Sequence, residues 1–214
     1  MTRDSQPPTV HRSLRAIILC LVAVVGLTAL DLGSKGWALD ALSSERPGGP
    51  PPVCEPTELG HILYQRQRGD AVVLVPGYLE LRYAENCGAA FGLMREAEGW
   101  VRRTVFGLAA AVASVTLLWM FVRGRGGPMF AWSVPFIVSG AIGNLVDRAR
   151  LGYVVDFVRF HLQDTWEWPT FNVADAAITV GVVLLLLDGL REGRREKAEA
   201  KPAPEIDAGD APRS

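Results

Sequence analysis

The chain has 214 residues, of which 49% are hydrophobic and 21% are charged, and its mean hydropathy is +0.18. This composition is too apolar for an ordinary soluble domain and too polar for a chain that lies wholly within a membrane. The formal net charge is −1, so no overall basic field points to a nucleic acid as a partner.

Four apolar segments carry most of the hydrophobic residues. Each is roughly long enough to cross a hydrocarbon core of about 30 Å. A single soluble core would not need four such segments. The sequence therefore predicts an all-α membrane protein with four transmembrane helices in a domain that covers residues 14–190. The four segments are residues 14–30, 105–122, 129–146 and 173–187.

The first segment has features of a secretory signal peptide, because Arg12 and Arg15 precede its apolar run. No small-x-small cleavage site follows, so we expect an uncleaved first helix after a polar cytoplasmic tail at residues 1–13. Cys20 does not fit a lipidation site, because Leu19 stands where a small residue is needed.

The long loop after this helix begins with a stretch, residues 46–52, that is rich in proline and glycine. Such a stretch cannot form a helix or a central strand, and we expect a flexible outer insertion at about residues 43–70. Beyond it, residues 71–75 favour a strand, residues 76–77 a turn, and residues 78–83 alternate. The first outer loop therefore predicts a small extracytoplasmic β-sheet on the membrane surface.

Asn86 and Gly88 lie in a run of mostly small residues, 86–92, that follows the predicted strands. Small residues allow the backbone to approach something bound, although a plain strand end is the alternative. Cys54 and Cys87 both lie in this loop, where a disulfide can form, and two unrelated free thiols fit the sequence at least as well. The three histidines do not cluster, and no metal-ligand spacing is present, so no metal is expected.

The third segment ends in a group of small and polar residues. Gly140 and Gly143 permit close helix packing, and Asn144 and Asp147 share one helical face. The adjacent Arg148 can pair with a carboxylate and brace the end of the helix. A polar cap with only a structural role is the alternative interpretation.

Asp156 and Asp175 are the residues with the strongest functional signal. Asp156 has apolar neighbours, and Asp175 lies in the first turn of the fourth segment, three residues after Asn172. Taken alone, Asp175 and Asn172 fit ordinary helix capping. Carboxylates beside a bilayer-length apolar stretch are nevertheless functional candidates, and two that converge can share one proton, as in an aspartic protease. Trp166 and Trp168, between the two aspartates, fit an aromatic belt at the membrane interface.

Five motifs in chain order resemble those of lipoprotein signal peptidase (signal peptidase II). The similarity extends from about residue 14 to residue 190. The motifs are Asp31 followed by Lys35, residues 86–91 (NCGAAF), residues 143–148 (GNLVDR), residues 152–157 (GYVVDF) and residues 171–178 (FNVADAAI).

The resemblance implies a four-helix intramembrane aspartyl endopeptidase without a metal or organic cofactor. Its substrate would be a bacterial prolipoprotein, cut just before a diacylglyceryl-modified cysteine. Asp156 and Asp175 match the catalytic pair. The residues that match site-shaping or supporting positions are Asp31, Lys35, Asn86, Gly88, Asn144, Asp147, Arg148 and Asn172. The outer insertion and the tail beyond residue 197 are additions to the family pattern.

Membrane lipid and the lipid-modified substrate are the expected partners of a monomer in the bacterial inner membrane, with no nucleic acid. Four spans place both termini on one side, and that side carries eleven of the 22 lysines and arginines over about half the length of the other. This density favours cytoplasmic termini, although Arg102 and Arg103 oppose it locally. We expect the tail at residues 191–214 to be disordered.

Two other classes of membrane protein can also contain acidic residues. A small transporter or proton channel would have its carboxylates deeper, at the midplane, and a membrane scaffold would need no paired acids. Asp188 lies at the opposite end of the fourth segment and fits a helix cap. The distinguishing observation is whether Asp156 and Asp175 come together.

Overall fold

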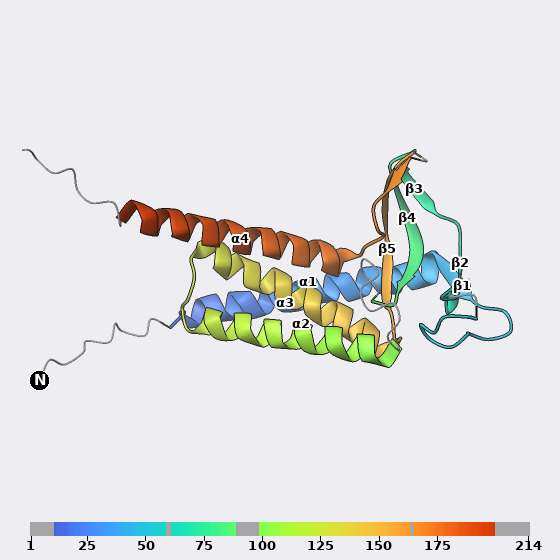
Figure 1. Ribbon diagram of the computed structural model, residues 1–214, viewed down its shortest axis with the longest axis horizontal. Coiled ribbons are helices and arrows are strands. Elements are labelled where there is room, and N and C mark those ends of the chain that lie inside the picture. The colour runs from blue at the N-terminus through green and yellow to red at the C-terminus, as the bar shows by residue number, and fades with distance from the viewer. Residues whose placement is uncertain (1–10, 59–60, 89–98, 164, 200–214) are drawn as a thin grey trace, which may run out of the picture.

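The structure is a computed structural model that describes residues 11–58, 61–88, 99–163 and 165–199. A bundle of helices carries a small β-structure at one end (Figure 1). Each helix contains a segment long and apolar enough to cross a membrane, which confirms the predicted spans. The helices are α1 (Leu14–Ala41), α2 (Gly99–Val122), α3 (Pro128–Arg150) and α4 (Val173–Glu199).

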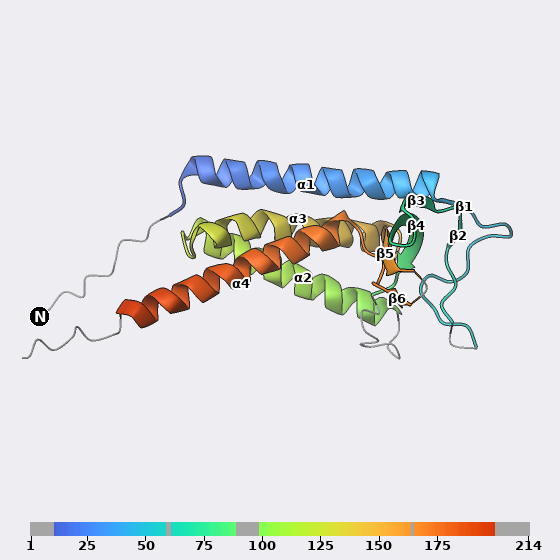
Figure 2. The same ribbon diagram turned by 90° about the horizontal axis from the view of Figure 1, so that it is seen from above.

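Helix α3 lies at the centre of the bundle. It contacts α1, α2 and α4, and Figure 2 shows it between α1 and α2. In the apolar window of α3, 56% of the residues are buried within the protein, against 6–22% in the other helices. The outward faces of those helices carry exposed side chains such as Leu19, Val112 and Leu186, which suit contact with lipid.

Glycines of α3 set how closely its neighbours approach. A Cβ atom on Gly140 would lie 2.4 Å from the carbonyl oxygen of Ala174, and one on Gly143 would lie 2.2 Å from Asp31 Oδ2. Neither position can hold a larger residue without a shift of α4 or of the Asp31 side chain. The predicted close packing at these two glycines is confirmed.

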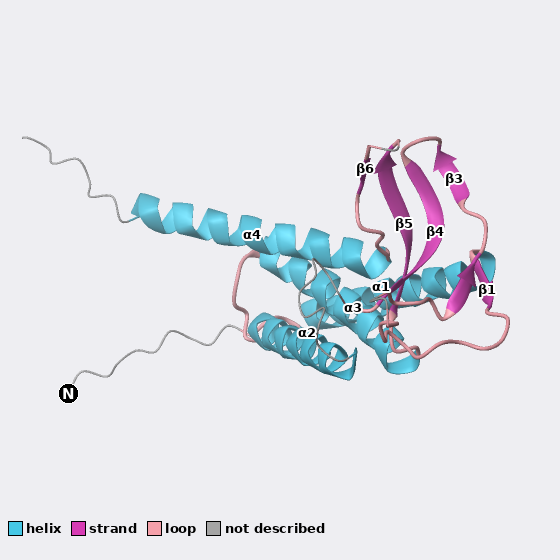
Figure 3. Cartoon of the chain, turned by 45° about the vertical axis from the view of Figure 1, so that its right-hand side comes forward, coloured by secondary structure: helices cyan, strands magenta, loops and turns pink. Residues whose placement is uncertain are grey.

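In the described residues, the β-structure consists of two antiparallel sheets that lie across the ends of the helices farthest from the two termini (Figure 3). The first pairs β1 (Ser43–Glu45) with β2 (Arg66–Arg68). The second has the strand order β3-β4-β5-β6. Its strands are β3 (Val72–Val75), β4 (Leu79–Asn86), β5 (Val154–Leu162) and β6 (Trp166–Glu167).

The predicted sheet is therefore present, but it is not built from the first outer loop alone. Strands β5 and β6 come from the second outer loop, and β5 pairs with β4. The four residues 154–157 at the start of β5 are all buried, so they show no alternation of polar and apolar residues. Since the buried Asp156 stands among apolar residues here, no alternating pattern marked the strand in the sequence.

The outer insertion is more ordered than predicted. The stretch 47–52 indeed forms no helix or strand, but β1 and β2 close the insertion at its two ends. A disulfide also joins Cys54 to Cys87, with their Cα atoms 5.6 Å apart. This resolves the two alternatives for these cysteines in favour of the bond.

The disorder predicted from residue 191 is wrong for the first part of that tail. Helix α4 continues to Glu199. Residues 191–199 contain no proline and consist mainly of arginine, glutamate, lysine and alanine, all good helix formers, which lets the membrane helix extend. The rest of the tail lies outside the described residues.

Candidate active site

Asp156 lies on β5, at the end of the bundle that carries the sheets, and is only 2% exposed. Two side-chain amides donate to its carboxyl group. Asn172 Nδ2 lies 2.6 Å from Oδ1, and Asn86 Nδ2 lies 3.0 Å from Oδ2. Strand pairing brings Asn86 into reach, because Asn86 is opposite Val154 in the β4–β5 register.

Asp175 occupies the first turn of α4, where it forms a reciprocal cap with Asn172. The Asp175 N–H donates to Asn172 Oδ1 at 2.9 Å, and the Asn172 N–H donates to Asp175 Oδ2 at 3.3 Å. Asn144 Nδ2 also donates to Asp175 Oδ1 at 2.8 Å. The capping interpretation is therefore correct, and Asp175 also takes part in a second set of hydrogen bonds.

Asn172 connects the two aspartates. Its amide nitrogen donates to Asp156, while its amide oxygen and backbone N–H bind Asp175. The carboxyl groups thus belong to one hydrogen-bonded cluster at one end of the bundle. The channel alternative would place them at the midplane, and the scaffold alternative does not require this convergence.

The environment of Asp156 favours its neutral form. Burial and, next in size, the negative charge of Asp175 together raise the pKa of Asp156 to about 8, against the opposing hydrogen bonds from Asn86 and Asn172. Near neutral pH, a proton therefore resides on Asp156. A neutral carboxyl group beside a second acid is the arrangement that acid–base chemistry on water requires.

Two further carboxylates hold the backbone next to these aspartates. Asp31 Oδ1 accepts from the N–H of Ala174, at 2.8 Å, and Asp147 Oδ2 accepts from the N–H of Val155, at 3.0 Å. Ala174 immediately precedes Asp175, and Val155 immediately precedes Asp156. Each supporting carboxylate thus fixes the chain one residue before one member of the pair.

Lys35 joins the two supports. Its Nζ atom lies 2.8 Å from Asp31 Oδ2, 3.3 Å from Asp147 Oδ2 and 2.9 Å from Asn144 Oδ1. Lys35 is 1% exposed, so this cation is fully surrounded by acceptors. A buried charge is tolerated only with such complete pairing, and the predicted support from Asp31 and Lys35 therefore has a physical basis.

The structure also places Gly88 and Arg148. Gly88 has a φ of +81°, which favours glycine, and its N–H donates to Asn86 Oδ1 at 2.9 Å. This bond turns the Asn86 amide nitrogen toward Asp156. Arg148 Nη1 donates to the carbonyl of Asn144 within α3, at 3.3 Å. Residues 89–92 of the predicted small-residue run lie outside the described residues.

Glu85 is a linking residue that the sequence did not single out. Its carboxylate accepts from the N–H groups of Gln65 and Arg66, at 2.8 and 2.9 Å, and from the Tyr83 hydroxyl at 2.9 Å. It thereby fastens the insertion to β4, one residue before Asn86. Its position beside the NCGAAF motif was the available signal.

Among the described residues, no three His, Cys, Asp or Glu side chains form a group that could hold a metal.

Sequence comparisons relate most of the chain to one group of bacterial proteins. The profile of a family described as signal peptidase (SPase) II matches residues 22–191. A lipoprotein signal peptidase of Pseudomonas fluorescens is 39% identical over 127 residues, which are 59% of this chain and 75% of the relative. One from Cupriavidus necator is 44% identical over 121 residues, which are 56% of this chain and 68% of the relative.

Two solved structures of bacterial membrane enzymes share the fold. The first, determined in meso at 2.3 Å resolution, has a TM-score of 0.63 and 20% identity, and the match covers 91% of this chain and 98% of that one. The second, at 1.9 Å resolution, has a TM-score of 0.58 and 22% identity, with coverage of 80% and 92%.

Proposed function

The chain belongs to the signal peptidase II family of aspartic peptidases, and we propose that Asp156 and Asp175 are its catalytic pair. The observation that carries this proposal is the position of Asn172, which hydrogen-bonds to both residues. The raised pKa of Asp156 adds to it, since it keeps a proton on that carboxyl group near neutral pH.

Each aspartate then has a distinct role. Asp156, protonated, donates a hydrogen bond to the carbonyl oxygen of the scissile peptide bond. Asp175, ionised, takes a proton from a water molecule, whose oxygen bonds to the carbonyl carbon while the proton of Asp156 passes to the carbonyl oxygen. The tetrahedral intermediate is neutral. Its C–N bond breaks as the proton on Asp175 passes to the leaving amine, and Asp156 recovers a proton from the intermediate.

The substrate is a prolipoprotein, in accord with the family, and the cut falls just before its diacylglyceryl-modified cysteine. Acyl chains in the bilayer fix the depth of the adjacent peptide bond, since each buried methylene contributes about 0.8 kcal/mol. The aspartates lie at the outer end of the bundle, where such a bond would be presented. No metal or organic cofactor takes part in this proposal.

The protein is a multi-pass bacterial membrane protein. We propose that it lies in the inner membrane with both termini in the cytoplasm. The density of basic residues supports this orientation. The Cys54–Cys87 disulfide supports it too, because the outer compartment is the oxidising one. One chain supplies both aspartates and all their amide partners, which supports a monomeric enzyme.

We place the four-stranded sheet on the membrane surface. Its strands run across the ends of the helices in Figure 1, and the same sheet exposes several large apolar side chains. Paired tryptophans suit the interface between water and lipid. The exposed side chains include Val73, Leu74, Phe160, Leu162, Trp166 and Trp168.

The test is cleavage of a lipid-modified prolipoprotein by Asp156→Asn and Asp175→Asn variants. We expect neither to cleave, because the asparagine side chain keeps the shape but can neither give up a proton as a carboxylic acid does nor accept one as a carboxylate does. Asp40→Asn, the same change at an exposed position at the end of α1, should cleave normally. Normal turnover by either site variant would remove that residue from the pair. Equal cleavage of unmodified substrate by the wild-type enzyme would refute the lipid requirement.

A further inference from the structure

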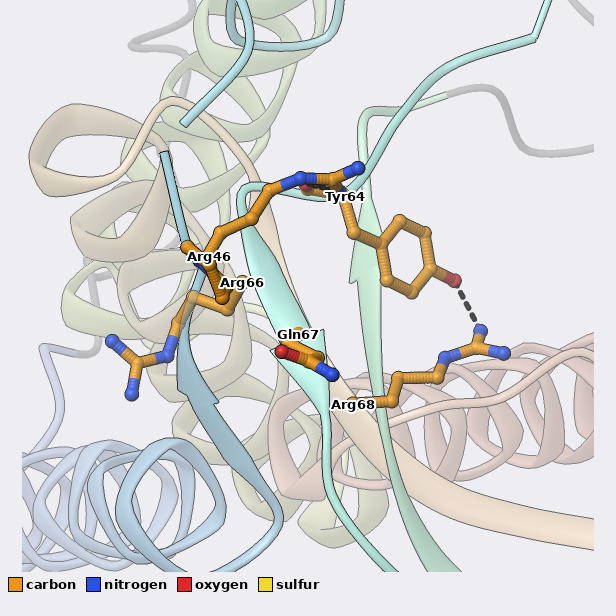
Figure 4. Close-up of a pocket in the computed structure, with 6 residues that line it drawn as sticks. Arg46, Tyr64, Arg66, Gln67 and Arg68 are labelled. Carbon is orange, nitrogen blue, oxygen red and sulfur yellow. Dashed lines mark hydrogen bonds between the residues drawn. The ribbon is translucent and has the colours of Figure 1, made fainter. Parts of the chain in front are cut away.

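A cavity of about 740 Å³ opens on the outer insertion, away from the aspartate pair. It is large enough for a lipid headgroup or a small organic anion. Three of the six side chains that line it are arginines. The lining residues are Arg46, Pro47, Tyr64, Arg66, Gln67 and Arg68 (Figure 4).

Tyr64 holds two of these arginines in place. Arg46 Nη1 donates to the carbonyl oxygen of Tyr64 at 2.9 Å. Arg68 Nη2 donates to the Tyr64 hydroxyl at 2.5 Å, and the Arg68 guanidinium lies 4.5 Å from the centroid of the same ring. A guanidinium has five N–H donors, and these contacts use one from each arginine. Donors therefore remain for a ligand.

Arg66 has a different role in the wall of the cavity. Its Nε donates to Ser43 Oγ at 2.7 Å and its Nη2 to the carbonyl of Leu39 at 3.3 Å, so it fastens β2 to the end of α1. Figure 4 shows its guanidinium turned away from Arg68. The recognition surface is thus formed by Gln67 and Arg68 on the fixed strand β2 and by Arg46, which follows β1.

The positive charge of this cavity has no carboxylate partner in the described part of the chain. The ion pairs found there join other residues. Glu45 is directly opposite Arg66 in the β1–β2 register, yet it makes no ion pair with it among the described residues. Cations that line one cavity repel each other, and an anion bound in it relieves that repulsion.

The length of α1 argues that the cavity lies near the level of lipid headgroups. Helix α1 has 28 residues and is therefore about 42 Å long, which matches the roughly 40–45 Å of a bilayer with its headgroups. Strand β1 starts two residues after α1 ends. The fork of a guanidinium matches the paired oxygens of a phosphate, which is the common anion at this depth.

We propose that Arg46 and Arg68 form a binding site for a phosphate group, supplied by an anionic phospholipid of the outer leaflet. The site is separate from the aspartate pair and does not depend on the catalytic proposal, although it rests on the proposed orientation of the chain. Binding of a phosphate would influence the two aspartates through Glu85. This residue accepts a hydrogen bond from the Arg66 N–H and precedes Asn86, which donates to Asp156.

The test is retention of lipid by the full-length protein, measured by native mass spectrometry after titration with dioleoyl phosphatidylglycerol or dioleoyl phosphatidylcholine. Wild type should retain the anionic lipid more strongly. An Arg46→Gln/Arg68→Gln variant should bind it at least about tenfold more weakly, because two charge-assisted hydrogen bonds are lost. Arg82→Gln, which removes a half-buried arginine of β4 outside the cavity lining, should bind like wild type.

Inorganic phosphate identifies the source of the ligand. Displacement of the lipid by millimolar phosphate, in wild type but not in the double variant, would mean that the site accepts free phosphate as well. Failure of phosphate to displace it would mean that the lipid is the ligand. Equal retention of phosphatidylglycerol by wild type and the double variant, at equal thermal stability, would overturn the proposal.

Discussion

The Lys35 ammonium group lies 2.9 Å from the amide oxygen of Asn144, and this contact decides which way the amide faces. An ammonium group has donors only, so the atom next to it must be the oxygen. The amide nitrogen therefore points to Asp175, at 2.8 Å. Lys35 thus determines how Asp175 is hydrogen-bonded without a contact to it.

Replacement of Lys35 by methionine should lower both stability and turnover. The change leaves Asp31 and Asp147 buried without a cation, which typically costs about 3–5 kcal/mol. Thermal unfolding in detergent measures this loss. The double variant Lys35→Met/Asp31→Asn should recover part of it, because one buried charge is then removed.

Turnover measurements distinguish a role of Lys35 in positioning Asn144 from a role in stability alone. At a temperature where Lys35→Met is folded, we expect a lower kcat and an unchanged KM, since Lys35 orients Asn144 rather than binding substrate. Wild-type kcat in that variant would show that the orientation of Asn144 has no part in catalysis.

The pH dependence of cleavage should report Asp156. Its pKa of about 8 means that the carboxyl group is protonated at neutral pH and loses its proton above pH 8. If Asp156 is the proton donor, kcat/KM falls as pH rises through about 8. A rate that continued to rise to pH 9 would assign the donor role to another group.

The same shift makes a prediction for stability. Unfolded Asp156 titrates near its ordinary pKa of about 3.9, so between that pH and about 8 the folded state holds a proton that the unfolded state has lost. The stabilisation of the folded state by this proton is complete below the pKa of Asp156 in the unfolded chain, and it is lost as pH rises through 8. Asp156→Asn should therefore flatten the decline in unfolding temperature over this interval. An identical decline in wild type and variant would contradict the assigned shift.

Gly143→Ala tests the packing beside the support network. The new Cβ would lie 2.2 Å from Asp31 Oδ2 and would displace the carboxylate that holds Lys35 and Ala174. Overpacking of this kind costs about 1–3 kcal/mol. Gly33→Ala, also in a membrane helix but with no atom within 4 Å, is the matched control and should not destabilise the protein. Equal unfolding temperatures for the two variants would refute the close contact.

Loss of the disulfide should destabilise the outer structure. Cys54→Ser/Cys87→Ser opens a loop with a sequence separation of 33, for which about 2–4 kcal/mol is typical. Turnover should fall as well, because Cys87 follows Asn86, which donates to Asp156. A reducing agent should lower the unfolding temperature of wild type and leave the double variant unchanged. Sensitivity of both proteins to the reductant would point to a cause other than this bond.

The sequence predicted the four spans and the two aspartates because a bilayer imposes a strong compositional pattern, against which a carboxylate is conspicuous. It could not show the pairing of β4 with β5, since those strands lie in different loops and β5 has no alternation at its start. The bond from Asp31 to Ala174 joins residues 143 positions apart, and no local pattern reports such a distance.

The Cys54–Cys87 bond closes a covalent ring that contains β2, β3 and β4. A protease that cut the chain near His61, an exposed residue within this ring, would produce two fragments still joined by one bond. One fragment would carry Lys35, and the other would carry Asp156 and Asp175. The nicked protein would therefore migrate as a single species until it was reduced, and the halves of its active site would stay together.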